Sequence, residues 1–193
     1  KDFWKTKPSG TSRLFVNAAF FFYLLSGIGP FALGPIVILL GKMNVYYLAV
    51  YYYLHFLYNG FFVFAIFGLL FKYFEVQAVD GVNLYSVIEQ KGRRFFWLTF
   101  GACIPAYALS TLWVKPPSII FMIGGIAALL QLVALLYFLP FLKLLKNKFS
   151  PLTTFLLGTA LFSYFLKLFF QLFSCLPWFA VKSFEAKNYV IIG

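Results

Sequence analysis

Long apolar runs separated by short charged segments dominate the chain. The runs are continuous rather than alternating, and each is longer than the roughly 10 residues that a barrel strand needs. Each also reaches the length of about 20 residues that one helical crossing of a membrane requires. The pattern predicts an all-α fold, a polytopic transmembrane helical bundle with the start of a sixth span near Val190. The five complete spans cover about 14–40, 46–71, 95–114, 119–142 and 152–176.

Lys and Arg residues are distributed unevenly between the two ends of these spans. Eleven of them lie before the first span, around the connection 73–92 or between the fourth and fifth spans, whereas four lie on the opposite side. Because cytoplasmic loops carry the excess of positive charge, we expect a cytoplasmic N-terminus and a cytoplasmic connection 73–92. The apolar positions of this connection fit two structures, an interfacial helix broken at Gly81 or a structured loop.

The composition excludes a water-soluble globule. Hydrophobic residues make up 63% of the 193 residues and charged residues 11%, with a mean hydropathy of +0.89. A formal net charge of +11 would suggest a nucleic-acid partner in a soluble protein. Here the cations flank apolar runs, so we expect membrane lipids with anionic head groups instead, and no nucleic acid. The 23% aromatic content also makes other membrane subunits plausible partners.

The chain begins at Lys1 without Met and ends just after a fresh apolar run starts. We therefore expect residues 1–193 to form a single transmembrane domain within a longer protein. Cys103 and Cys175 lie inside apolar segments without a metal-like spacing, so we expect small core-facing or lipid-facing side chains at both positions.

Glycine and proline interrupt several spans. Gly29, Pro30 and Pro35 lie near the middle of the first span, where lost backbone hydrogen bonds predict a bend or a break. A broken helix would line a cavity, whereas a kinked helix would only pack against its neighbours. Pro105 interrupts the third span in the same way, and Gly124, Gly125 and Ala128 give the fourth span a face suited to close helix packing.

His55 is the single histidine and lies near the middle of the second span. Tyr47, Tyr51, His55 and Asn59 are spaced four residues apart, so they share one helical face that must point into protein rather than lipid. An imidazole at this depth has three uses: an axial ligand to haem or another metal, a proton relay, or an interhelical hydrogen bond. The chain has no second histidine to complete a metal site.

Lys167 lies inside the fifth span with Ser163, Gln171 and Ser174 on a common face. We expect its long stem to carry the ammonium to the outer interface. The absence of Asp and Glu inside the spans argues against a Schiff-base lysine with a counter-ion. It also argues against a proton-coupled carrier built from this segment alone. Hydrolase, phosphate-binding and zinc motifs are absent, so the sequence contains no self-contained catalytic constellation and leaves enzymatic activity undecided.

Three segments carry a family resemblance: 51–60, 7–15 and 188–193. The chain resembles a bacterial family of multi-pass membrane proteins related to the haem–copper oxidase subunit I superfamily. The resemblance implies that His55 takes the place of a mid-membrane histidine that ligates haem or a metal, with Tyr51 and Asn59 beside it. The other histidines of that pattern would lie beyond both ends of this chain. It also implies a location in the bacterial inner membrane.

Three hypotheses follow from these observations. The first is haem or metal binding at His55 in an electron-transfer or gas-handling context. The second is a transporter or channel whose broken first span, at Gly29 and Pro30, lines a pathway with His55 as relay. The third is an accessory subunit of a membrane complex, in which the aromatic faces serve only as protein and lipid contacts.

Overall fold

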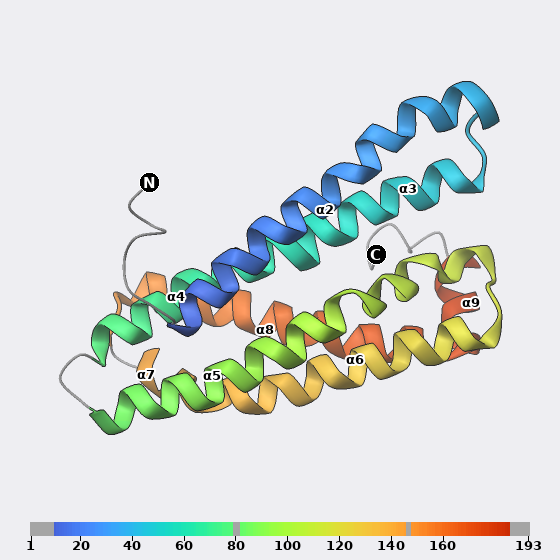
Figure 1. Cartoon of the computed structure of the whole chain (residues 1–193). Coiled ribbons are helices and arrows are strands. Elements are labelled where there is room, and N and C mark those ends of the chain that lie inside the picture. Colours follow the sequence, from blue (N-terminus) through green and yellow to red (C-terminus); the bar gives the residue numbers. More distant parts are fainter. Residues whose placement is uncertain (1–9, 79–81, 146–147, 186–193) are drawn as a thin grey trace.

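The computed structural model describes residues 10–78, 82–145 and 148–185, and this part of the chain is helical without a strand (Figure 1). Its elements, in chain order, are α2 (Thr11–Leu40), α3 (Asn44–His55), the π-helix η1 (Phe56–Phe62), α4 (Val63–Gln77), α5 (Val82–Cys103), the 3₁₀-helix η2 (Pro105–Val114), α6 (Ser118–Phe138), the 3₁₀ turn η3 (Leu139–Phe141), α7 (Leu142–Leu145), α8 (Pro151–Ser174) and α9 (Pro177–Glu185).

Five helical segments are long and apolar enough to cross a membrane. They are α2, the continuous α3–η1–α4 segment, α5 with η2, α6 with η3 and α7, and α8. The predicted all-α fold with five complete spans is thus confirmed, and the chain is a multi-pass membrane protein. The expected sixth span, starting near Val190, lies outside the described residues.

The connection predicted at 73–92 is largely helical. α4 continues to Gln77 and α5 begins at Val82, so the two spans themselves extend into this region. Of the two predicted structures, the helix interrupted near Gly81 is the closer one, because helices cover both sides of residues 79–81, which lie outside the described residues. The structured loop is wrong. Phe74 and Ile88 explain the extension, because both are buried, at 0% and 1% exposure, and anchor the helix ends on the bundle.

Of the two outcomes predicted for the first span, a bend or a break, the break is wrong. α2 runs as one helix from Thr11 to Leu40 through Pro30 and Pro35. Each proline removes one backbone donor, but a bilayer offers no water to compete for the remaining helical hydrogen bonds. Pro105 acts as predicted, since α5 ends just before it and the chain continues as the tighter η2.

Phenylalanine side chains fill the interior where α2, α4, α5 and α6–η3 meet. We call this group the phenylalanine core. Phe71 stacks on Phe15 with ring centroids 5.1 Å apart, and Phe67 contacts Phe138 edge-on at 5.2 Å. Such offset and edge-on contacts suit the aromatic quadrupole. Its members are Phe15, Phe64, Phe67, Phe71, Phe74, Phe95, Phe138 and Phe141.

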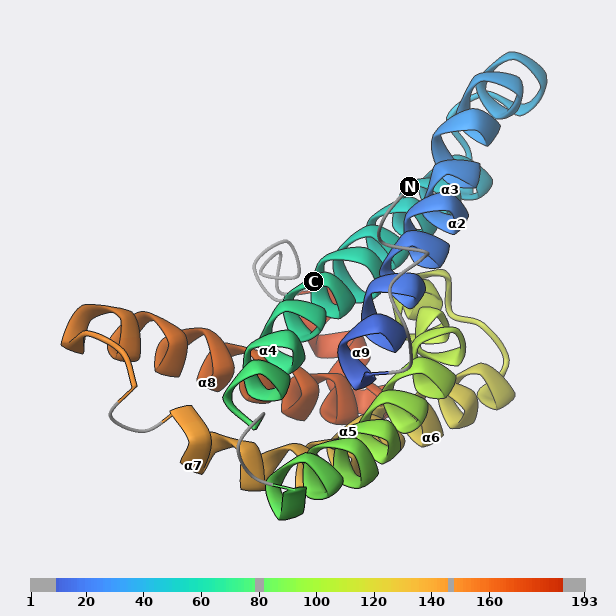
Figure 2. The same cartoon turned by 60° about the vertical axis from the view of Figure 1, so that its left-hand side comes forward.

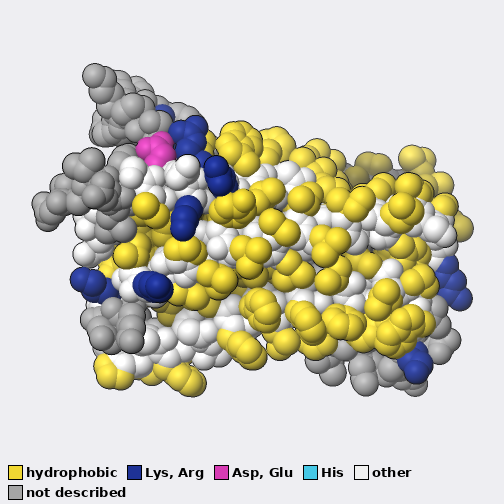
Figure 3. Space-filling model, turned by 90° about the horizontal axis from the view of Figure 1, so that it is seen from below, with side chains coloured by type: hydrophobic (Ala, Val, Ile, Leu, Met, Phe, Trp, Pro, Cys, Tyr) yellow, Lys and Arg dark blue, Asp and Glu magenta, His cyan; other side chains and the backbone are white. Residues whose placement is uncertain are grey.

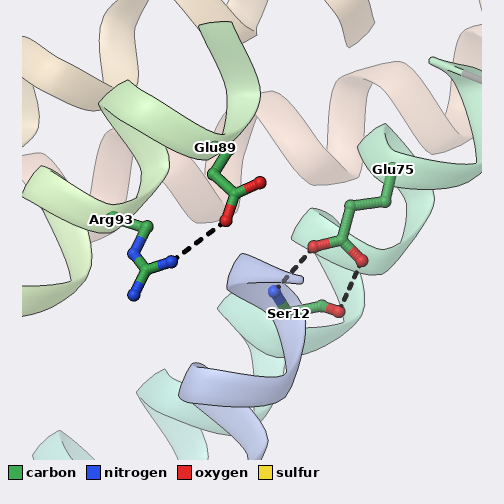
Figure 4. A network of polar contacts seen from close by, with 4 residues as sticks. All are labelled: Ser12, Glu75, Glu89 and Arg93. Carbon is green, nitrogen blue, oxygen red and sulfur yellow. Dashed lines mark hydrogen bonds and ion pairs between the residues drawn. The ribbon is translucent and has the colours of Figure 1, made fainter. Parts of the chain in front are cut away.

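Glu75 joins α4 to the start of α2 (Figure 4). Its Oε1 accepts a hydrogen bond from the backbone N–H of Ser12 at 2.9 Å, and its Oε2 accepts one from the Ser12 hydroxyl at 2.6 Å. The first amides of a helix lack intrahelical partners, so this carboxylate caps α2 from a neighbouring helix. Glu89 and Arg93, by contrast, form an exposed ion pair within α5.

Described Lys and Arg residues gather at the end of the bundle that holds the α4–α5 connection and α7, as Figure 3 shows, while hydrophobic side chains cover its middle. We call this end the basic end. The predicted charge asymmetry therefore separates the two ends of the bundle. That the basic end faces the cytoplasm stays a prediction. At the opposite end lie Lys42, Lys115 and Lys182.

α8 is the least covered of the five spans. Leu168 is its one buried residue within the described part of the chain. Figure 2 shows the first half of α8 projecting away from the other helices. The small-residue face of α6 packs as predicted: a Cβ on Gly124 would lie 2.6 Å from Leu109, and one on Gly125 would lie 3.6 Å from Cys175 at the end of α8.

Candidate functional site

His55 lies at the junction of α3 and η1, buried at 4% exposure. Its Nε2 lies 2.9 Å from the backbone oxygen of Cys103, at the end of α5. Phe56 contacts the imidazole edge-on, and the Tyr107 ring from η2 lies 5.8 Å away. The imidazole is therefore enclosed by protein, as the polar stripe predicted.

Asn59 joins His55 to Lys167. The side-chain Nδ2 of Asn59 lies 3.2 Å from His55 Nδ1, one turn earlier in the segment. Its Oδ1 accepts a hydrogen bond from Lys167 Nζ on α8. Three spans thus meet in one polar group, which we call the histidine–lysine cluster: His55, Asn59, Lys167 and the backbone of Cys103.

The hydrogen bonds of this cluster have a consistent direction. A backbone oxygen only accepts, so His55 Nε2 carries the hydrogen and Nδ1 is left as the acceptor. Asn59 Nδ2 then donates to Nδ1, and its Oδ1 is free to accept from the lysine. This assignment makes His55 neutral, with the donors running from Lys167 through Asn59 and His55 to Cys103.

The π-helix η1 places Asn59 in this position. π-helical turns are rare and occur frequently at functional sites. Gly60 within η1 lets α2 approach closely, because a Cβ there would lie 2.6 Å from the Phe22 Cβ. The thiol of Cys103 lies 3.7 Å from the Asn59 backbone oxygen, a further contact to the widened turn. Gly60 therefore lets the π-helical turn that carries Asn59 pack closely against α2.

The expectation that Lys167 extends to the outer interface is wrong. Its ammonium turns inward to Asn59 and lies 5.6 Å from the centroid of the Tyr164 ring. α8 continues for seven residues beyond Lys167, to Ser174, a rise of about 10 Å that the side chain would have to cover. An amide oxygen and an aromatic face nearby satisfy the cation at lower cost. Among the described residues Lys167 forms no ion pair with a carboxylate.

The other predicted site residues lie apart from this cluster. The Tyr51 ring packs against Trp113 of η2, with centroids 5.9 Å apart. Gly29 is buried in the contact between α2 and α3, where a Cβ would lie 2.8 Å from Tyr53. Pro30 is exposed on the outer side of α2. Gly29 therefore serves helix packing, and neither it nor Pro30 belongs to the cluster.

The cluster as folded does not fit a haem or metal ligand. Both ring nitrogens of His55 bond to protein groups, so neither has a lone pair available for a metal. Within the described part of the chain, no three His, Cys, Asp or Glu side chains come together in a way that would hold a metal ion. An axial bond from His55 would require the loss of the Asn59 or the Cys103 hydrogen bond.

Sequence reasoning missed two further polar residues, Thr99 on α5 and Gln131 on α6. Both are buried, at 3% and 6% exposure, and the hydroxyl of Thr99 and the Oε1 of Gln131 have no hydrogen-bond partner among the described residues. Their signal in the sequence is a single polar side chain within a long apolar run. Sequence reasoning also missed the Cys103 backbone oxygen, because a backbone acceptor leaves no mark in the residue pattern.

The fold and this site define the class of protein: a polytopic α-helical membrane protein with an ionisable polar cluster inside its bundle. Comparison with known proteins adds no family, because neither a protein-family model, a curated protein nor a solved structure matches the chain. The resemblance to the relatives of haem–copper oxidase subunit I stays a prediction.

Proposed function

We propose that this protein is a membrane transporter that binds and releases a proton at the histidine–lysine cluster. The observation that carries the proposal is the hydrogen-bonded chain from Lys167 through Asn59 to His55, formed by three different spans. Ionisable residues inside a membrane are costly and usually mark proton or substrate pathways. This is the transporter hypothesis with His55 as relay, without the broken first span.

The inward position of Lys167 weakens the argument that the missing carboxylates give against proton coupling. The sequence has no Asp or Glu inside the predicted spans, which argues against proton coupling when His55 is the single proton-binding group. The structure adds the lysine amine as a second such group, two hydrogen bonds away from the imidazole. Two basic groups in an apolar interior repel each other when both are charged, so the cluster holds one proton more easily than two.

The single proton has two arrangements in this cluster. In the first, which agrees with the contacts of the cluster, a charged Lys167 donates to Asn59 Oδ1 and Asn59 Nδ2 donates to neutral His55. In the second, His55 carries the proton on Nδ1 and donates to Asn59 Oδ1, and the turned amide donates to the lone pair of the neutral lysine. A turn of the Asn59 amide thus couples the two protonation states, as a proton-coupled transporter requires.

Haem binding at His55, in an electron-transfer or gas-handling context, is the competing hypothesis from the family resemblance. It requires a free ring nitrogen, whereas the observed hydrogen bonds occupy both Nε2 and Nδ1 of His55. An accessory subunit is the third hypothesis, in which the cluster only holds spans together. These three make different demands on His55, so variants of this residue separate them.

The test is proton flux into liposomes that contain the full-length protein, measured with a trapped pH-sensitive dye under an imposed gradient. His55→Phe keeps an aromatic ring against Phe56 but removes both nitrogens. Lys167→Met keeps an unbranched side chain of nearly the same length and removes its charge. Lys72→Met is the matched control, because Lys72 is exposed near the basic end. We expect a several-fold loss of flux in the first two variants and none in the control.

Other outcomes would overturn the proposal. Flux through the wild type no faster than through protein-free liposomes contradicts transport of protons. Unchanged flux in both cluster variants, with lower thermal stability, assigns the cluster to helix association alone. A visible absorption band of the purified protein that disappears in His55→Phe would favour haem ligation instead.

A further inference from the structure

We infer that internal water molecules held by Thr99 and Gln131 form the path by which a proton moves between Lys167 and His55. This inference rests on the proposed function and adds the part of the mechanism that side chains alone do not supply. The Asn59 amide joins the two basic groups, but an amide exchanges hydrogen bonds and does not readily pass on a proton. A second connection between the lysine and the imidazole is therefore needed.

Thr99 and Gln131 carry the first observation. Both side chains are more than nine-tenths buried, and the Thr99 hydroxyl and the Gln131 Oε1 lack a hydrogen-bond partner among the described residues. Leaving such atoms unpaired away from water is energetically unfavourable. Buried polar atoms without protein partners usually bind ordered water, which makes two to four hydrogen bonds.

Thr99 lies one helical turn from Cys103 on the same face of α5. The Cys103 backbone oxygen accepts from His55, and its thiol lies against the backbone of Asn59. Thr99 thus lies about 6 Å along the helix axis from Cys103, whose backbone oxygen contacts the imidazole. α5 therefore brings one unpaired polar atom to the level of the cluster.

Gln131 lies at the same level on α6. Two contacts set the register of α6 against the α5–η2 segment: Gly124 packs on Leu109, and Phe138 packs on Phe95. Gln131 lies midway between Gly124 and Phe138, seven residues from each. Ala102 lies midway between their partners Phe95 and Leu109, so Gln131 is level with Ala102, the residue directly before Cys103. Both anchors therefore place Gln131 beside the end of α5 that receives the His55 hydrogen bond.

The same argument places Lys167. Gly125 lies against Cys175, which fixes the antiparallel register of α6 and α8. Lys167 is eight residues before Cys175, and Val133 is eight residues after Gly125, so Lys167 is level with Val133. Gln131 is two residues from Val133, so Lys167 and Gln131 lie within one helical turn of the same level. Gln171, one turn beyond Lys167, has a third buried oxygen without a partner among the described residues. Unpaired polar atoms from three helices thus surround one layer of the bundle.

Water in this layer would satisfy these atoms and connect the two basic groups. A proton leaving Lys167 would pass to a water molecule while that water gives one of its own protons onward, and His55 would receive a proton on the nitrogen that Asn59 vacates. No oxidant or further reactant takes part, and the charge in the cluster is unchanged. Thr99 and Gln131 are positioning residues in this step, since they hold water and do not themselves gain the proton.

The experiment is X-ray radiolytic labelling of the full-length protein in lipid, followed by mass spectrometry, because hydroxyl radicals formed from bound water modify the side chains beside it. We expect labelling of Cys103 and His55 in the wild type although both are buried. In the double variant Thr99→Val, Gln131→Leu this labelling should fall several-fold. Thr159→Val is the control, because the Thr159 hydroxyl is exposed and bonds to its own helix at Phe155.

The labelling does not depend on transport, so the two proposals fail separately. Absence of labelling at both cluster residues in the wild type, or equal labelling in the double variant, would overturn the water path. Proton flux in the same variants is the second measurement, with a several-fold decrease expected while thermal stability is kept. Undiminished flux would also refute the inference, and it would leave the role of His55 and Lys167 intact.

Discussion

The phenylalanine core and the histidine–lysine cluster both include residues of the continuous α3–η1–α4 segment, and they are held by different forces. Phe64, Phe67 and Phe71 contact several rings at once, so no single direction or partner defines their position. His55 and Asn59 each have one partner per polar atom, at fixed distances. One part of the segment is specified by shape, and the adjacent part by hydrogen-bond direction.

This difference between the core and the cluster arises because the spans are surrounded by lipid and not by water. Lipid tails are as apolar as phenylalanine, so burial in the core brings close packing and aromatic contacts with little gain from leaving water. Polar atoms in the same environment have few alternative partners, which makes their geometry specific even when each bond contributes modest stability. We therefore expect the core to determine how firmly the spans associate, whereas the proposed proton chemistry depends on the cluster.

Phe71→Ala tests the core and has the largest expected effect on stability. Phe71 is fully buried and contacts Phe15, Phe95 and Phe141. A cavity of about 100 Å³ at about 24 cal/mol per Å³ predicts a loss of about 2.4 kcal/mol in the free energy of unfolding, measured in mixed micelles. Phe31→Ala, at an exposed position on α2, is the control and should change little. Equal losses in both would contradict the assigned core.

Gly60→Ala tests the connection between core and cluster. The added Cβ would collide with Phe22, so α2 or the π-helical turn has to shift. Overpacking of this kind costs about 1–3 kcal/mol. Gly158→Ala on α8 meets no atom within 4 Å and should be neutral or slightly stabilising, because alanine favours helices. If the shift reaches Asn59, proton flux should fall together with stability in Gly60→Ala alone.

Glu75→Ala separates a structural carboxylate from a surface one. The change leaves the Ser12 amide and hydroxyl at the start of α2 without their acceptor and should cost about 1–2 kcal/mol. Glu89→Ala removes the exposed ion pair with Arg93 and should cost at most about 0.5 kcal/mol. Chemical denaturation of the two variants side by side measures the difference. A larger loss in Glu89→Ala would invert the interpretation of Figure 4.

Lys167→Met should affect stability less than Phe71→Ala, Gly60→Ala or Glu75→Ala. Interhelical hydrogen bonds in membranes contribute about 0.6 kcal/mol on average, and removing a buried charge offsets part of that loss. We therefore expect unfolding to change by less than about 1 kcal/mol, against the several-fold loss of proton flux proposed above. A loss as large as that of Phe71→Ala would show that the cluster, like the core, mainly holds the spans together.

Much of the fold was predictable because apolar length is a local property. The predicted span 14–40 corresponds to Thr11–Leu40, and 119–142 lies within Ser118–Leu145. One error came from contacts between helices and the other from the effect of the bilayer. The extension of α4 and α5 depends on where Phe74 and Ile88 pack, and the intact first span depends on how a bilayer treats a proline within a helix.

The candidate site was predictable only in part. Spacing of four residues identified the face that carries His55 and Asn59, because helical periodicity follows directly from residue numbers. Lys167 was found as a candidate and assigned the wrong direction, since its partner Asn59 is 108 residues away in the chain. Neither the Cys103 backbone oxygen nor the level of Gln131 follows from any local pattern.

By itself, then, the sequence determined an α-helical protein of five membrane spans, a strongly basic end and a single deep histidine, all consequences of composition and short-range spacing. Only the tertiary structure decided that the lysine turns inward, that both histidine nitrogens are bonded, and that polar atoms from three helices share one layer. The physical reason is that hydropathy depends on each residue and the solvent, whereas a hydrogen bond between spans depends on the register of helices far apart in the chain.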